Sequence, residues 1–177
     1  MDRTVVALFE GEYRRYRTLA EGALGQLREE EFSTSLGGTN SIATLVWHIS
    51  GNLQSRFTDF LDADGEKPWR EREEEFAPRS PSRAELMESW NRGWGVLMET
   101  LGGLEDRDLP RTVTIRGLPL RVDEALLRSL AHMASHVGQI VLIARSLKGD
   151  GWQYLSIPPG GSAEYNRRPD RDRPPTR

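Results

Sequence analysis

The 177-residue chain contains no cysteine. Disulfides, thiolate nucleophiles, cysteine-ligated zinc sites and iron–sulfur clusters are therefore excluded, and histidine and carboxylate side chains remain as the strong metal ligands. Long apolar runs are also missing, because the longest, around residues 42–49 and 140–144, fall far short of the ~18 residues that a membrane span needs. Residues 1–15 carry charges where a signal peptide has an apolar core. We therefore expect a cytoplasmic protein that does not cross a membrane.

The charge is nearly balanced, with 24 Lys and Arg against 27 Asp and Glu, a formal net charge of −3. A nucleic-acid-binding protein would normally need an excess of basic residues, so we expect no nucleic-acid partner. The sequence also has no Gly-rich phosphate loop, no Gly-x-Ser-x-Gly elbow and no His-Glu-x-x-His motif. Nucleotide hydrolysis and serine chemistry consequently have no support.

Apolar residues recur at helical spacing in four segments, and capping or breaking residues mark where these segments start and stop. The predicted helices cover residues 4–27, 41–61, 82–101 and 123–147. Ser82 and Glu85 have the spacing of a capping box, and Trp90 and Trp94 share one face of the third helix. Four helices of similar length predict an all-α four-helix bundle. The long 62–81 connection is expected to cross one end of it.

Two further segments complete the predicted fold. Residues 112–122 alternate apolar and polar side chains on both sides of Arg116-Gly117, which predicts a small hairpin between helices three and four. Residues 152–159 are expected to pack back on the bundle as an irregular arm. We predict one domain over residues 1–166, followed by a disordered Arg/Pro-rich tail over residues 167–177, which has no apolar anchor.

The chain has only three histidines, all in apolar surroundings. His132 and His136 are four residues apart, so they project from one face of the fourth helix and can share an ion. If helices two and four are neighbours, His48 supplies a third ligand. Three imidazoles would hold Zn²⁺, Ni²⁺ or a similar ion and leave a position open to water or substrate. The alternative is that each histidine is hydrogen-bonded separately, without a metal.

Other polar residues follow the same helix faces. Asn52 and Arg56 lie one and two turns after His48, and Ser129 and Gln139 are each three residues from a histidine. Such groups can orient imidazoles or contact a substrate, and Arg56 can bind a carboxylate or phosphate if it points inward. Alternatively Asn52 and Gln139 are ordinary buried amides and Arg56 is solvated. Asn52 and Arg56 are the candidate catalytic residues.

Several stretches of the sequence resemble the DUF1572 family within the DinB/YfiT-like superfamily. They are residues 47–60, 64–70, 114–117, 132–141, 155–158 and 164–166. The resemblance implies a DinB-like four-helix bundle that holds a divalent metal, Ni²⁺ or Zn²⁺, on His48, His132 and His136. Characterised relatives in the superfamily are thiol-dependent transferases and isomerases that use bacillithiol, mycothiol or glutathione, and many are dimers. DUF1572 itself is a family of unknown function.

This chain departs from the family pattern at two positions near the expected metal. Leu118 stands where many relatives have an acidic residue, and Ser135 where an aromatic residue is common. The substrate pocket is therefore expected to differ from that of relatives even where the ion does not.

Three functional hypotheses follow. The first is a metal-dependent enzyme, a thiol S-transferase or hydrolase, in which the ion lowers the pKa of a small thiol or water for attack on a small-molecule substrate. The second is a non-catalytic metal-binding or stress-related protein with a structural ion. The third is a structural protein with three core histidines and no metal. In all three we expect a homodimer.

Overall fold

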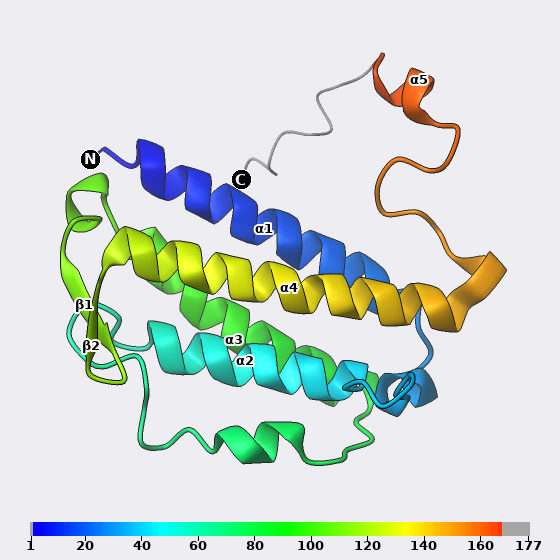
Figure 1. Ribbon diagram of the computed structural model, residues 1–177, viewed down its shortest axis with the longest axis horizontal. Coiled ribbons are helices and arrows are strands. Elements are labelled where there is room, and N and C mark those ends of the chain that lie inside the picture. Colours follow the sequence, from blue (N-terminus) through cyan, green and yellow to red (C-terminus); the bar gives the residue numbers. More distant parts are fainter. Residues whose placement is uncertain (1, 168–177) are drawn as a thin grey trace.

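The computed structural model describes residues 2–167, which form a helical bundle with one small hairpin (Figure 1). The helices are α1 (Thr4–Leu24), α2 (Ile42–Phe57), α3 (Arg83–Gly103), α4 (Val122–Lys148) and the short α5 (Ser162–Tyr165). Short 3₁₀ helices are η1 (Glu29–Ser33), η2 (Arg72–Phe76), η3 (Asp106–Asp108) and η4 (Gly149–Gly151). The strands are β1 (Thr112–Ile115) and β2 (Leu118–Arg121). The predicted mainly α-helical bundle with a hairpin between helices three and four is confirmed.

The helix starts follow the capping residues closely. The Ser82 side chain caps α3 by accepting a hydrogen bond from the backbone N–H of Glu85. The Glu85 carboxylate in turn accepts one from the backbone N–H of Ser82, which confirms the capping box. The first predicted helix ends three residues too late and the second ends four residues too late. Helix α2 ends at Phe57 because Thr58 is extended and Asp59 has a left-handed φ of 48°, a conformation that no helix continues.

The four long helices do not simply alternate in direction. In Figure 1, α1 and α4 run one way, whereas α2 and α3 run the other way. Hydrogen bonds between the helices agree with this: the Tyr13 hydroxyl on α1 donates to the Leu126 carbonyl on α4, and Thr100 near the end of α3 donates to Phe57 at the end of α2. Helix α2 is therefore parallel to α3 and antiparallel to α4.

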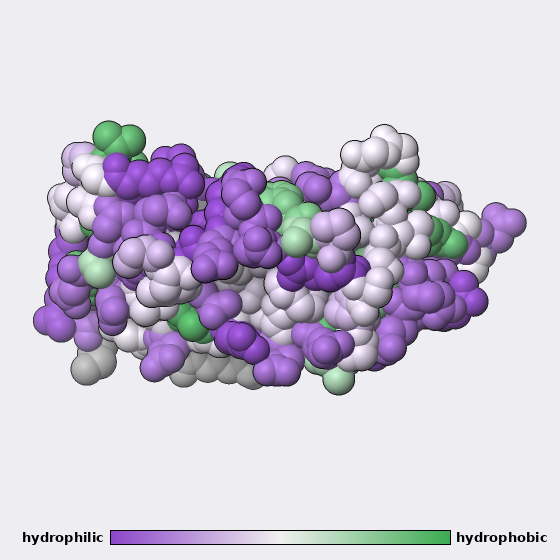
Figure 2. Space-filling model, turned by 90° about the horizontal axis from the view of Figure 1, so that it is seen from below, coloured by the Kyte–Doolittle hydropathy of each residue, from purple (hydrophilic) through white to green (hydrophobic). Residues whose placement is uncertain are grey.

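The parallel arrangement of α2 and α3 sets the path of the segment between them. After α2 ends, residues 58–82 must return to the other end of the bundle, so this connection runs along its length and places η2 beside α2 (Figure 1). The expectation that it crosses one end of the bundle is wrong for this reason. Seen from the side of this connection, the surface is mostly hydrophilic with small apolar patches (Figure 2).

The α2–α3 interface is the most closely packed contact between helices that we find in the structure. A Cβ atom added to Gly93 on α3 would lie 2.6 Å from Cα of Ser50 on α2, so only glycine permits this approach. Trp90 and Trp94 are fully buried on α3, with ring centroids 5.4 Å apart. They anchor the core, as their shared helix face predicts.

The hairpin is held against the 58–82 connection. Its turn is Arg116-Gly117, where both residues have positive φ (56° and 73°), as a two-residue turn with right-handed strand twist requires. The Asp64 carboxylate accepts hydrogen bonds from the backbone N–H groups of Arg116, Gly117 and Glu66 at 2.7–2.8 Å. The turn of the hairpin is thus fixed by a single carboxylate.

The segment after α4 returns to α1. Gln26 and Gln153 exchange hydrogen bonds of 2.8 and 2.9 Å, and the Leu155 side chain lies against Gly22. The predicted arm is confirmed over this contact. Residues 168–177, which hold most of the predicted disordered tail, lie outside the described residues.

One stretch of the described chain, Val122–Gly151, has the length and hydropathy of a membrane span. A core helix of a helical bundle meets the same two criteria. Helix α4 buries a continuous face that includes Leu126, Met133, Val137 and Ile140 against its neighbours. Length and hydropathy alone therefore do not identify a span, and the expected cytoplasmic location stays a prediction.

Candidate metal centre

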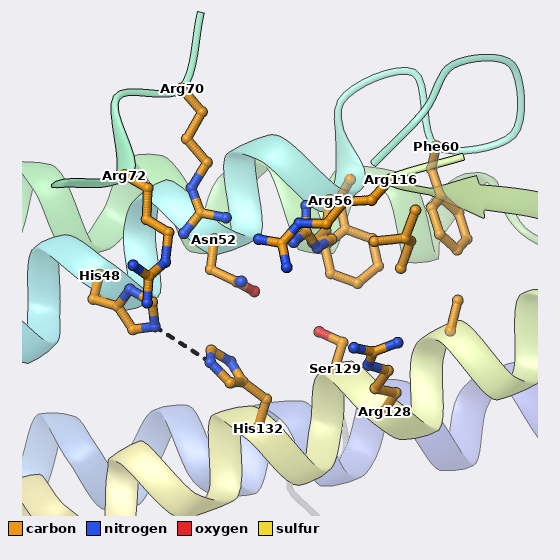
Figure 3. A pocket seen from close by; sticks show the side chains of 13 residues that line it. His48, Asn52, Arg56, Phe60, Arg70, Arg72, Arg116, Arg128, Ser129 and His132 are labelled. Atoms are coloured by element: carbon orange, nitrogen blue, oxygen red, sulfur yellow. Dashed lines mark hydrogen bonds between the residues drawn. The ribbon is translucent and has the colours of Figure 1, made fainter. Parts of the chain in front are cut away.

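The three histidines come together between α2 and α4. The Nε2 atom of His132 lies 3.3 Å from Nε2 of His48 and 3.1 Å from Nε2 of His136 (Figure 3 shows the first contact). One nitrogen from each ring lies within 4.8 Å of the other two. The prediction that α2 brings His48 to the pair on α4 is confirmed.

These distances fit one shared cation. With Zn–N bonds of ~2.0–2.1 Å, two nitrogens on one ion are ~2.8–3.0 Å apart at a right angle and ~3.3–3.4 Å apart at a tetrahedral angle. The separations of 3.1 and 3.3 Å lie within that interval. His48 is buried, and His132 and His136 are half-buried. The three residues could therefore hold a metal ion with one side left open.

The tautomers that the three rings can adopt also favour a shared cation. Nδ1 of His48 lies 2.9 Å from a carboxylate oxygen of Glu75, which can only accept, so Nδ1 carries the proton. In neutral His48 the Nε2 atom then has a lone pair directed at His132. A hydrogen on Nε2 of His132 can be directed at only one of its two neighbours, and without that hydrogen the lone pairs of His132 and His48 face each other. A cation would satisfy all three nitrogens at once.

Glu75 was not identified in the sequence, and it is the partner that fixes His48. It comes from η2 in the 58–82 connection, and its side chain is 8% exposed. Arg70, whose side chain is 2% exposed, donates to both of its oxygens at 2.7 and 2.9 Å. The carboxylate is thus held from two sides, and it sets the ring tautomer and orientation of His48.

Gly51 makes room for this carboxylate. A Cβ atom at position 51 would lie 2.1 Å from Oε1 and 2.8 Å from Cδ of Glu75. Because Arg70 and His48 fix the carboxylate, it has little freedom to move away. The glycine three residues after His48 is therefore part of the site, although it contributes no side chain.

Burial favours the neutral form of His132 and His136. The pKa of His132 is lowered to about 4, most of all by burial and then by the charges of His136, His48 and two arginines. Burial and then His48 lower the pKa of His136, against an opposing effect of Gln139. Burial acts to raise the pKa of Glu75, but hydrogen bonds from His48 and Arg70 outweigh it and hold the pKa below its usual value. Neutral rings beside an ionised carboxylate are the states that bind a metal ion.

A cavity of about 220 Å³ adjoins the cluster (Figure 3). His48 and His132 line one end, and Asn52, Arg56 and Ser129 also line it, as their helix faces predict. Arg56 is already engaged, since it donates to the Gly65 carbonyl and, at 3.1 Å, to Glu66. The catalytic roles given to Asn52 and Arg56 stay predictions.

The two positions that depart from the family pattern lie away from the cavity lining. Leu118 follows the hairpin turn and is 66% exposed, and Ser135 is exposed on α4. Neither is among the lining residues, so they give no reason for the pocket to differ.

The fold and the histidine cluster define a helical-bundle protein with a candidate three-histidine metal centre. Residues 3–161 match the family described as protein of unknown function (DUF1572). The chain therefore belongs to the DUF1572 family. No curated protein and no solved structure matches it.

Proposed function

We propose that this protein is a divalent-metal-dependent enzyme of the DinB/YfiT-like superfamily, a thiol S-transferase or hydrolase acting on a small molecule. The observation that carries the proposal is the convergence of three Nε2 atoms, with a carboxylate orienting one ring, at the end of a cavity. A structural ion needs no cavity beside it, whereas a substrate does.

The protein's own residues have distinct roles in this proposal. His48, His132 and His136 would hold Zn²⁺ or Ni²⁺, and Glu75 with Arg70 keeps His48 in the binding tautomer. The bound ion would supply Lewis acidity, which lowers the pKa of a low-molecular-weight thiol or water. Asn52, which lines the cavity next to His48, would orient the substrate, and the apolar wall would exclude water around it.

Metal analysis of protein purified without an affinity tag and without chelator tests the first half of the proposal. We expect about one Zn²⁺ or Ni²⁺ per chain in the parent and in Ser135→Ala, an exposed neighbour on α4, and almost none in His136→Ala. Metal-free parent protein, with no uptake of added Zn²⁺ or Ni²⁺, would leave only a histidine cluster without an ion.

Activity measurements test the second half. Metal-loaded parent and His136→Ala are assayed with small thiols paired with electrophiles and with hydrolysable esters, and the melting temperature of each is recorded. We expect turnover in the parent only. A loss of melting temperature in His136→Ala, with no turnover found in the parent, would instead establish the structural-ion alternative. The homodimer implied by the superfamily stays a prediction that sedimentation equilibrium can test.

A further inference from the structure

The cavity beside the histidines is strongly cationic. Five of its thirteen lining residues are arginines and none is acidic. The arginines come from α2, the 58–82 connection, the hairpin turn and α4: Arg56, Arg70, Arg72, Arg116 and Arg128. Figure 3 shows them on the walls of the same space. In a chain with a net charge of −3, this is a local concentration of positive charge.

Nearby carboxylates compensate only part of this charge. Glu75 pairs with Arg70, Glu73 with Arg72, and Glu66 is shared by Arg56 and Arg116. Arg128 has no hydrogen-bond or ion-pair partner among the described residues. Five guanidinium groups are thus balanced by only three carboxylates, and the excess positive charge is available to bind an anion.

Two more polar side chains, Ser129 and Asn52, line the cavity. The Ser129 hydroxyl is buried, in a residue that is 8% exposed, and it lies near the Tyr13 hydroxyl, which donates to the Leu126 carbonyl. The Asn52 amide makes no hydrogen bond with a described residue. In Figure 3, both side chains point into the space between α2 and α4. An unpaired polar group on a cavity wall normally binds water or a ligand.

The remaining lining is apolar. It is formed by Phe57, Phe60, Ile115 and Ala125, and Figure 3 shows Phe60 at the end of the cavity away from His48 and His132. A ligand that fills the whole space therefore needs an apolar body as well as a charged group.

We propose that this cavity is a binding site for a small organic oxyanion, a carboxylate, phosphonate or sulfonate, whose charged group is held by Arg128 with Ser129 and Asn52 and whose apolar body packs on Phe57 and Phe60. Arg116 adds charge from the hairpin, and Arg56, engaged by Glu66 and the Gly65 carbonyl, supports the wall rather than binding the ligand. This gives the substrate class for the proposed enzyme. Only the identification of the ligand as a substrate rests on that function.

Titration calorimetry with phenylphosphonate, on the full chain after removal of metal by chelator, tests the anion site alone. We expect binding that weakens at high salt, and no binding of benzyl alcohol, which has a similar ring but no charge. Arg128→Gln should weaken phenylphosphonate binding roughly tenfold or more, as expected for loss of a charge-assisted hydrogen bond. Arg128→Lys should restore part of it.

Arg145→Gln is the matched control. Arg145 lies on the same helix about 25 Å further along, over the Tyr154 ring, and its replacement should leave binding unchanged. Equal affinities of parent and Arg128→Gln, or no binding by the metal-free parent, would overturn the proposal. Arg128-dependent binding in a protein that takes up no metal would refute the proposed enzyme and leave the anion site standing.

Discussion

Helix α2 presents two different faces to its neighbours. Toward α3, Ser50 lies against Gly93 so closely that no side chain fits between the backbones. Toward α4, His48 and Asn52 face a cavity with polar groups that lack protein partners. The first face has the dense packing that stabilises a core, and the second has the unpaired groups that bind ligands. Stability and binding should therefore respond to different substitutions on one helix.

Glu75→Gln should give the largest change on the cavity side. The amide no longer fixes the His48 tautomer as a carboxylate does, so Zn²⁺ affinity should fall ~10–100-fold. Buried Arg70 loses its counter-charge, which should lower the free energy of unfolding by roughly 2–3 kcal/mol. Competition titration with a zinc chelator and urea unfolding measure the two effects. Glu71→Gln, an exposed carboxylate on the same connection, is the control, and equal losses in both variants would remove Glu75 from the site.

Gly93→Ala tests the opposite face of α2. The added methyl group would meet the Ser50 backbone, and such overpacking should lower the free energy of unfolding by ~1–3 kcal/mol. Gly95→Ala, on the same helix with open space around it, should instead raise it by ~0.5–1 kcal/mol, because alanine is the better helix former. Urea unfolding followed by circular dichroism compares them. Metal content should stay at the parent level in both, and its loss in Gly93→Ala would mean that the two faces are coupled.

Gly51→Ala probes the site without touching a polar group. The methyl group would displace the Glu75 carboxylate, so we expect roughly tenfold weaker Zn²⁺ binding, a smaller loss than in Glu75→Gln. The gain in helix propensity offsets part of any loss in stability. Zinc competition titration measures the affinity. If Gly51→Ala binds zinc as the parent does, the carboxylate has more freedom than its bonds to Arg70 and His48 indicate.

Asp64→Asn should have the smallest effect, because it loosens only the hairpin that carries Arg116 to the cavity. Amide exchange at Arg116 and Gly117, followed by NMR at neutral pH, should be faster in Asp64→Asn and unchanged in Asp62→Asn. Backbone hydrogen bonds from Glu66, Gly117 and Arg116 hold the pKa of Asp64 well below its usual range. Its contribution to stability is therefore present above about pH 4 and is lost as the pH falls further. An Asp64 carboxyl signal that titrates in the ordinary range would contradict this.

The sequence was sufficient for the features that depend on local spacing. Helix periodicity, the Ser82 cap and the Arg116-Gly117 turn predicted the elements, and the spacing of His132 and His136 placed two ligands on one face. His48 could be predicted as the third ligand because the apolar pattern of α2 shows on which face of the helix it lies. The direction of α2 relative to α3 could not be predicted, since periodicity carries no information on which way neighbouring helices run.

The partner of His48 could not be read from the sequence. Glu71, Glu73, Glu74 and Glu75 form an acidic run in which only Glu75 is buried, and the path of the connection over α2 decides which one turns inward. The anion site was missed for a similar reason. Arg128 looks like any exposed residue of α4 until the hairpin and the connection bring other arginines beside it.

The path of residues 58–82 along the bundle has a consequence for how this family can vary. Two points of the segment are pinned, at Asp64 under the hairpin and at Glu75 beside Gly51. Insertions and deletions among relatives should therefore be rare between these points, where residues 64–70 also carry the resemblance to the family. The spacing from Arg70 to Glu75 should be invariant wherever the three histidines are retained.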